Sequence, residues 1–276
     1  MVLQPRDVEL LCDLFRHNVM SRGQLQTLHY GSTPRCNFRL RQLFDVGYVS
    51  RHVLPGLPHA QSVGVQVLYS IGKAALPVIA LHLGHEESEI RRVYRRTRTP
   101  LWVQHSLCVG DLRLAFHRAA IAGDVQIEQW LSEEESRHDF EVRASGGAWR
   151  KEVFKPDAFV KLRQQTPDDN AEYCYFLEAD LGTTSQDKML NKWRIHQLYQ
   201  DIGLFHELYQ SDSFRTLVVT TSERRLENLL DLMEQQGSDL FWFSTFDAVN
   251  EHGIIAPIWR SSSRPDSFSL LDKVAS

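Results

Sequence analysis

The residues from Tyr173 to Tyr199, YCYFLEADLGTTSQDKMLNKWRIHQLY, decide the fold that we expect for this chain. The stretch begins as an aromatic, apolar run that is typical of a buried strand, and it ends in a helical pattern. Side chains alternate between the faces of a strand, so Glu178 and Asp180 lie on one face. Two buried carboxylates repel each other and lose hydration, so a cation, a metal ion or solvent exposure must offset that cost. The stretch therefore predicts a buried strand, an acidic site at its end, and a helix.

A second acidic strand precedes this stretch, and Asp157 follows Pro156 within it. From Trp102 onward the patterns predict a helix, three strands, a helix, a strand, a helix and a strand. The expected ranges are 102–122, 125–131, 151–162, 173–180, 185–199, 214–221, 223–236 and 240–245. A short strand at 254–259 and a loosely ordered Ser-rich tail follow. This order predicts a mixed sheet flanked by helices.

The front of the chain predicts a different layout, with three helices followed by a two-stranded hairpin. The expected helices cover 5–16, 22–28 and 33–46, and the strands cover 48–53 and 65–70. This is the layout of a winged helix-turn-helix, whose third helix enters the major groove while the hairpin contacts the DNA backbone. The fold class is therefore α+β, with a winged helix followed by a mixed sheet. We expect domains at 1–84 and 101–262, a basic linker helix at 85–100, and the tail at 263–276.

Basic residues on the third helix and the hairpin are the candidate DNA contacts, because arginine reads guanine or binds phosphate. They are Arg35, Asn37, Arg39 and Arg41 on the helix, with Arg51 and His59 at the hairpin. An alternative is a winged helix used for protein contacts, with solvated arginines.

The charge of the chain is divided unevenly. Residues 1–100 hold 13 Lys and Arg against 7 Asp and Glu, a net of +6, and the remainder holds 18 against 28, a net of −10. A basic front half indicates a polyanionic partner such as double-stranded DNA. The segment 86–100 adds further candidate phosphate contacts, Arg91, Arg92, Arg95 and Arg96. The alternatives are a chance imbalance and a solvated linker helix, since Glu87 lies four residues before Arg91.

Composition argues against membrane and secreted classes. No apolar run approaches the roughly 20 residues that span a bilayer, and no basic segment followed by an apolar core opens the sequence. The four cysteines form no CxxC pair, which favours a reducing compartment over a cysteine zinc site. We expect a cytoplasmic bacterial protein without a membrane partner, and a homodimer is left open.

Two resemblances follow from these motifs. Pro156-Asp157 on one strand and Glu178-x-Asp180 on the next resemble the restriction-endonuclease-like, PD-(D/E)xK, fold. The chain from about residue 5 to 235 is also similar to the replication-relaxation family of plasmid and mobile-element proteins. The segments that carry this likeness are Arg6-Asp7, 39–49, 105–107, Pro156-Asp157-Ala158, 176–183, Lys192-Trp193 and 218–229, of which LEADLGT (177–183) is the most specific.

The nuclease resemblance implies a Mg²⁺ site in which Asp157 and Glu178 bind the ion, and the metal activates water for phosphodiester cleavage. Asp180 stands where that fold has its lysine. Lys188 or Lys192 on the following helix would restore the cation, and we favour Lys192. Asp180 is then either a third metal ligand or the partner of a lysine. Without metal, Lys192 with Glu178 and Asp180 would be a structural ion cluster.

Together these observations predict a DNA-binding protein that acts in replication, relaxation or transfer of a plasmid or mobile element, alongside other replication or transfer proteins. The missing in-place lysine and the acidic second half favour a nuclease-like domain that does not cleave. One alternative is a Mg²⁺-dependent DNA endonuclease. Another is a winged-helix transcription regulator whose second half senses a ligand or dimerises.

Overall fold

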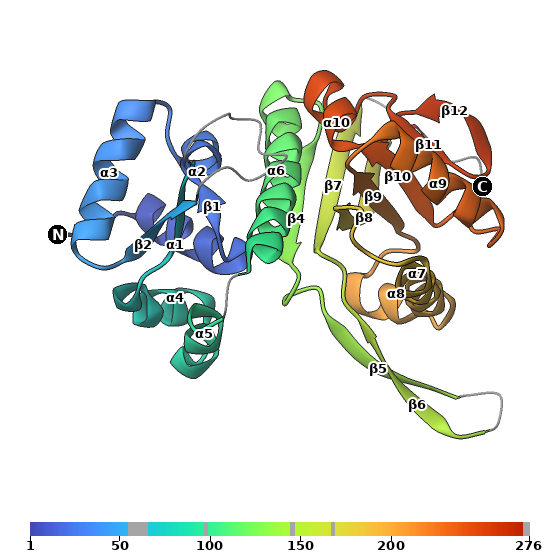
Figure 1. The fold of residues 1–276 in the computed structure, drawn as a ribbon, viewed down its shortest axis with the longest axis horizontal. Helices are drawn as coiled ribbons and strands as arrows, with labels where there is room; N and C mark the ends of the chain where they lie inside the picture. Colours follow the sequence, from blue (N-terminus) through green and yellow to red (C-terminus); the bar gives the residue numbers. More distant parts are fainter. Residues whose placement is uncertain (55–65, 97–98, 144–146, 167–168, 273–276) are drawn as a thin grey trace. The chain divides into compact units, whose positions relative to one another are not determined.

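The computed structural model describes residues 1–54, 66–96, 99–143, 147–166 and 169–272 (Figure 1). The chain forms two compact units, residues 1–114 and 115–276. The sequence placed the domain boundary at 100/101, whereas the structure places it inside helix α6 (Pro100–Ala122).

The first half of α6 belongs to the first unit because its side chains pack there. Val103 and Leu107 share an apolar cluster with Val19 and Leu68. Gln24, which is 3% exposed, donates hydrogen bonds to the Leu107 carbonyl and to Asp111 Oδ1, both at 2.8 Å. A buried amide must keep its hydrogen bonds, so these contacts fix the first half of α6 in this unit.

The first unit has the predicted order of three helices and a hairpin. Its elements are α1 (Pro5–His17), β1 (Met20–Ser21), α2 (Arg22–His29), α3 (Thr33–Asp45), β2 (Val49–Leu54), β3 (Gln66–Ile71), a 3₁₀ turn at Lys73–Ala75, α4 (Leu76–Leu83) and α5 (Glu87–Tyr94). The three strands form an antiparallel sheet in the order β1-β3-β2. Ser21 caps α2 by accepting a hydrogen bond from the Gln24 amide, and Gly47 follows α3 with φ of 77°, as its position after the helix predicts.

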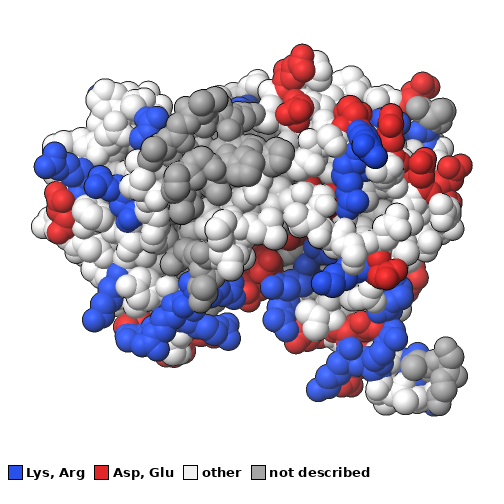
Figure 2. Space-filling view, in the orientation of Figure 1, with Lys and Arg blue, Asp and Glu red and all other residues white. Residues whose placement is uncertain are grey.

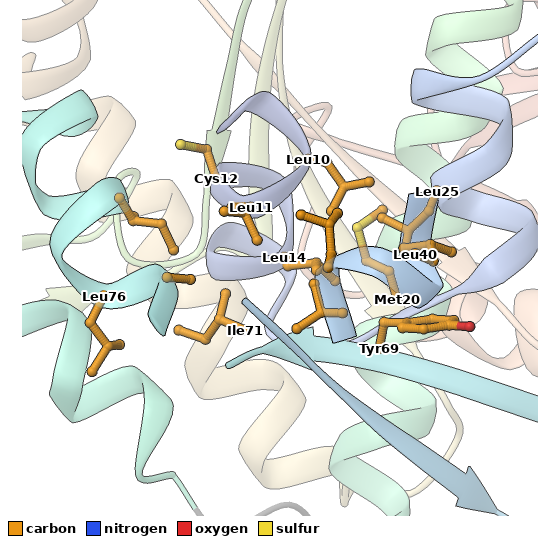
Figure 3. Close-up of a cluster of buried hydrophobic side chains, with 14 of the residues drawn as sticks. Leu10, Leu11, Cys12, Leu14, Met20, Leu25, Leu40, Tyr69, Ile71 and Leu76 are labelled. Atoms are coloured by element: carbon orange, nitrogen blue, oxygen red, sulfur yellow. The ribbon is translucent and has the colours of Figure 1, made fainter. Parts of the chain in front are cut away.

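Apolar side chains from all of these helices meet in one core. Figure 3 shows Leu10, Leu11 and Leu14 of α1 beside Leu40 of α3 and Ile71 of β3. All five are at most 1% exposed. Burial of a leucine or isoleucine side chain contributes roughly 1.5–3 kcal/mol, so this cluster sets the packing of α3 against α1.

The second unit is built on a seven-stranded mixed sheet in the order β12-β11-β10-β9-β8-β7-β4. Its strands are β4 (Gln126–Ser132), β7 (Ala158–Thr166), β8 (Asp169–Asp180), β9 (Arg215–Thr220), β10 (Phe241–Thr245), β11 (Trp259–Ser261) and β12 (Arg264–Phe268). Strands β8, β9 and β10 are parallel neighbours, and the other pairs are antiparallel. This confirms the α+β class with a mixed sheet flanked by helices.

Helices α7 (Gln186–Asp201), α8 (Leu204–Tyr209) and α9 (Glu223–Glu234) cover one face of this sheet, and α10 (Phe246–His252) follows β10. Phe176 of β8, Trp193 of α7, Leu229 of α9 and Phe243 of β10 belong to the same buried cluster. Glu178 lies two residues after Phe176 and so faces the same helices.

The predicted strand at 151–162 was wrong, because two strands occupy that range. β6 (Trp149–Phe154) ends before Pro156, and β7 begins after Asp157. Proline has no backbone N–H to donate to a sheet, which explains a break at this position. β6 pairs with β5 (His138–Arg143), which the sequence did not reveal, in a separate two-stranded hairpin.

The expected loose tail is also different in the structure. β12 pairs with β11, Phe268 is 5% exposed and Leu270 is fully buried. The hydroxyl of Tyr175 on β8 donates to the Leu270 carbonyl at 2.5 Å. The segment 264–270 therefore belongs to the folded unit, and residues 273–276 lie outside the described part.

No helix within the described ranges is long and apolar enough to cross a membrane.

Candidate functional site

The three candidate acids lie at one end of two neighbouring strands. β7 and β8 are antiparallel and pair Ala158 with Leu177, so the start of β7 lies beside the end of β8. Asp157 Oδ2 accepts a hydrogen bond from the Ala179 amide at 2.8 Å. Asp157, Glu178 and Asp180 are 8%, 7% and 6% exposed, so their charges require compensation inside the protein.

Lys192 of α7 supplies a cation to two of these acids. Its ammonium contacts Glu178 Oε2 and lies 3.9 Å from Asp157 Oδ1. Burial opposes the charged form of Lys192, but the attraction of Glu178 and Asp157 outweighs burial and raises its pKa. The side chain is 37% exposed, so solvent screens part of the attraction between its charge and the carboxylates. The structure thus brings Asp157, Glu178 and Lys192 together.

His196 also belongs to this cluster, and sequence reasoning missed it. Its Nε2 lies 3.0 Å from Glu178 Oε1, although the contact does not have hydrogen-bond geometry. Its Nδ1 lies 2.9 Å from Thr216 Oγ1. Burial lowers the pKa of His196 despite the neighbouring carboxylate, so the ring is neutral at pH 7. The spacing of four residues from Lys192 on one helix was the available signal.

Asp180 is compensated separately by α9. Arg225 Nε donates to Asp180 Oδ2 at 2.9 Å, and the Thr220 hydroxyl donates to the same oxygen at 2.8 Å. Asp180 therefore pairs with an arginine rather than with either lysine that the sequence suggested. Lys188 is exposed on α7.

The residues present do not fit a three-carboxylate magnesium site. Asp180 is held by Arg225, and the two oxygens of Glu178 face Lys192 and His196. Among the residues that the structure describes, no group of three or more His, Cys, Asp or Glu side chains is placed to hold a metal ion. Mg²⁺ would have to displace the Lys192 ammonium, so an internal ion network describes the donor set better.

A cavity of about 570 Å³ lies elsewhere in the second unit, along α7 and α9. Trp193, Gln197, Arg215 and Met233 are among its lining residues, and none of the three candidate acids lines it. The acid cluster is therefore not the floor of this cavity.

In the first unit, three of the candidate DNA contacts on α3 are exposed. Arg35, Asn37 and Arg41 are exposed, whereas Cys36 and Leu40 point into the core. Arg41 is 84% exposed, and its Nε lies 3.9 Å from Asp45 Oδ2. These side chains form the α3 surface, which we define as Arg35, Asn37 and Arg41.

Arg39 does not lie on the α3 surface. Its Nε donates to Asp7 Oδ1 at 2.8 Å, and its NH2 group donates to Asp7 Oδ2 at 2.5 Å and to the Val2 carbonyl at 3.0 Å. Asp7 is 1% exposed. Burial opposes the charge on Asp7, but the Arg39 hydrogen bonds outweigh this and lower the Asp7 pKa. The structure thus assigns Arg39 to a bond between α3 and α1.

The remaining basic candidates differ in their exposure and in the contacts that they make within the protein. Arg51 is exposed on β2, with its guanidinium 5.0 Å from the centre of the Phe44 ring. Arg92 and Arg95 are exposed at α5, whereas Arg91 forms an ion pair with Glu87, and Arg96 is half-buried. Figure 2 shows Lys and Arg side chains gathered over α5. His59 lies outside the described residues.

The buried neutral histidines predict acid sensitivity. Burial and Arg113 lower the pKa of His17 to about 3, and burial lowers that of His196. Because these pKa values are lowered in the folded state, the unfolded chain binds more protons than the folded chain below about pH 6.5. The free energy of unfolding is therefore highest above that pH and decreases as the pH falls. Each histidine should cost at most about 1.4 kcal/mol of unfolding free energy per pH unit. Denaturant titrations between pH 8 and 5 measure this loss.

The matched variants for that experiment are His196→Gln and His206→Gln. His206 is 68% exposed and is the control, and His196→Gln should flatten the pH dependence more than His206→Gln does. Equal slopes in both variants would contradict a buried neutral His196.

Comparison with known proteins found one match. The family model for replication-relaxation proteins matches residues 11–210. No curated protein and no solved structure matches the chain. The matched range contains α3, the hairpin β2–β3, and the Asp157, Glu178, Lys192 and His196 cluster. Because the match covers more than half of the sequence, the chain belongs to the replication-relaxation family.

Proposed function

We propose that the chain binds double-stranded DNA through its first unit during replication or relaxation of a plasmid or other mobile element. The observation that carries the proposal is the α3 surface, where Arg35, Asn37 and Arg41 are exposed on the third helix of a winged-helix layout. In that layout the third helix enters the major groove, where arginine pairs with guanine and asparagine with adenine. The family and the basic front half support a nucleic-acid partner.

The neighbouring side chains suit the same partner. Phe38 is 66% exposed beside Arg35 and Asn37, and apolar side chains on such helices contact thymine methyl groups. Arg51 on β2 is placed on the hairpin that contacts the backbone in this layout. Arg92 and Arg95 of α5 add phosphate contacts.

The second unit, in our proposal, takes part without cutting DNA. Its acids are paired with Lys192 and Arg225 inside the protein rather than gathered as a ligand set. Incubation with supercoiled and single-stranded DNA in Mg²⁺ or Mn²⁺ tests this, and we expect neither cleavage nor a metal-dependent rise in Tm. Cleavage that disappears in both Asp157→Ala and Glu178→Ala would establish an endonuclease instead.

Removal of both arginines of the α3 surface should weaken duplex binding. Arg35→Ala with Arg41→Ala removes two phosphate or base contacts, so affinity should fall about 10- to 30-fold at roughly 0.15 M salt, and the slope of log K against log salt should flatten by about 1.8. Fluorescence anisotropy of a labelled duplex measures both quantities.

Lys188→Ala with Arg224→Ala is the matched control, because both side chains are exposed in the other unit. It also removes two positive charges and should leave the salt slope unchanged. Equal losses in the control and in Arg35→Ala with Arg41→Ala would mean that only net charge matters, and the α3 surface would then not be the contact.

A further inference from the structure

The β5–β6 hairpin is a feature that the proposed function does not use. Its strands pair with each other and form a sheet apart from the seven-stranded one. Figure 1 shows the hairpin extending away from the helices and strands of the second unit. The turn at 144–146 lies outside the described residues.

The end of the hairpin away from its turn, formed by His138 and Phe154, packs against the helices of the second unit. The ring of Phe154 stacks on Tyr199 of α7 at 4.0 Å between centroids, with an interplanar angle of 3°. His138 Nε2 lies 2.9 Å from the Tyr209 hydroxyl, and Arg194 of α7 donates to Glu152 at 2.9 Å. These contacts hold one face of the hairpin against the helices, so its strands are positioned before any partner binds.

The opposite face of the hairpin is exposed. The register pairs Arg143 with Trp149, Glu141 with Lys151, and Asp139 with Val153, and directly paired residues share a face. Arg143, Trp149 and Lys151 are exposed, and the exposed fraction of Trp149 is 68%. We define Arg143, Trp149 and Lys151 as the hairpin face. Two cations flank a large aromatic ring here, although the chain beyond residue 100 has a net charge of −10.

We propose that the hairpin face binds double-stranded DNA, as a second contact that rests on the proposed DNA-binding function. Arg143 and Lys151 contact phosphates, and Trp149 packs against sugars and base edges in the groove. A two-stranded ribbon fits the major groove, where apolar side chains contact base edges such as the thymine methyl group. The charge of the face favours a polyanion over a protein partner, because cations with an interleaved aromatic ring suit phosphates and bases together.

Acidic residues mark the limit of the contact. Glu141 lies opposite Lys151 on the same face, and Asp139, one rung nearer the attached end, is held by Arg137 at 2.8 Å. Phosphates therefore meet net positive charge only at the outer rungs of the hairpin. Replacement of Lys151 should therefore weaken DNA binding, whereas replacement of Glu141 opposite it should strengthen DNA binding. A general loss of structure would weaken binding in both variants.

The test measures binding of the full chain to a labelled duplex of about 30 base pairs at salt concentrations between roughly 50 and 200 mM. Arg143→Ala with Lys151→Ala should weaken binding about 10- to 30-fold near 0.15 M salt and flatten the salt slope by about 1.8. Trp149→Ala should weaken it about 5- to 30-fold through lost packing of the ring in the groove. Glu141→Gln should strengthen binding about two- to threefold, because it removes a nearby negative charge.

Val153→Ala is the control on the same face, nearer the attached end, and should bind as the unaltered chain does. Unchanged Tm values show that the variants are folded. Absence of duplex binding by the unaltered chain would overturn both the proposed function and this inference. Binding that falls in Arg35→Ala with Arg41→Ala but stays constant in every hairpin variant would overturn this inference alone.

Two further outcomes would also overturn it. If the hairpin variants change the affinity for single-stranded DNA and not for duplex, the face binds unpaired bases. If Trp149→Ala dissociates a dimer in sedimentation without a change in duplex affinity, the face pairs two copies of this chain.

Discussion

Replacement of Arg39 by alanine is expected to lower the unfolding free energy of the first unit by about 3 kcal/mol without weakening DNA binding of the folded protein. The change leaves Asp7, which is 1% exposed, without the guanidinium that neutralises it. It also removes hydrogen bonds to the Val2 carbonyl and to Gln42. A buried charge left alone costs more than the pair contributes, so the loss should be large.

Arg41→Ala is the matched control, because it should affect DNA binding rather than stability. Both arginines lie on α3, two residues apart, but Arg41 is 84% exposed and its loss should change stability by less than about 0.5 kcal/mol. Arg41→Ala should instead weaken DNA binding. Denaturant unfolding and anisotropy on the same samples separate the two effects. If Arg39→Ala is as stable as the unaltered chain and its affinity for duplex DNA is reduced, Arg39 contacts DNA and the prediction is wrong.

The Asp7 variant completes the experiment. In Asp7→Asn the buried negative charge is gone, so Arg39→Ala in that background should cost less than in the unaltered chain. A difference of about 1–3 kcal/mol between the two backgrounds is expected for a direct buried pair. Additive losses would mean that Arg39 acts through packing of its stem rather than through Asp7.

These arginines show what the sequence can and cannot predict in the first unit. The apolar pattern of 33–46 predicted α3, and Gly47 predicted its end, because both signals are local. The pattern did not separate Arg39 from Arg35 and Arg41, since the difference depends on Asp7, which lies 32 residues away. A charged side chain at a helix surface is assigned to solvent or to a partner only when the packing is known.

In the second unit, the sequence predicted the buried strands but not the exposed hairpin or the folded C-terminal segment. The continuous apolar runs of β8, β9 and β10 were predicted, because strands buried on both faces have a strong pattern. β5 was missed because its charged residues, such as Asp139, Glu141 and Arg143, resemble those of a loop, and β6 was merged with β7 into one predicted strand. The Ser-rich segment after Arg260 suggested disorder, yet Phe268 and Leu270 are buried in the folded unit.

Replacement of Lys192 by methionine is expected to have the largest effect in the second unit, a loss of about 2–4 kcal/mol in unfolding free energy. Methionine keeps the apolar stem and removes the charge that faces Glu178 and Asp157. The estimate stands below that for a fully buried pair because Lys192 is 37% exposed and solvent screens part of the interaction. Lys188→Met, one turn earlier on α7 and exposed, is the matched control and should cost less than about 0.5 kcal/mol.

The pH dependence of the Lys192→Met loss distinguishes an ion network from simple packing. Lys192 is one of the charges that hold the pKa of His196 down, so its removal lets that pKa rise. Protonated His196 then compensates Glu178, and the cost of Lys192→Met should shrink as the pH falls from about 8 to 5.5. Glu178→Gln should restore part of the stability lost in Lys192→Met, because it removes the carboxylate that was left alone. If the loss is constant with pH and Glu178→Gln adds to it, Lys192 is held by its stem, and the acids at the strand ends are compensated by other groups.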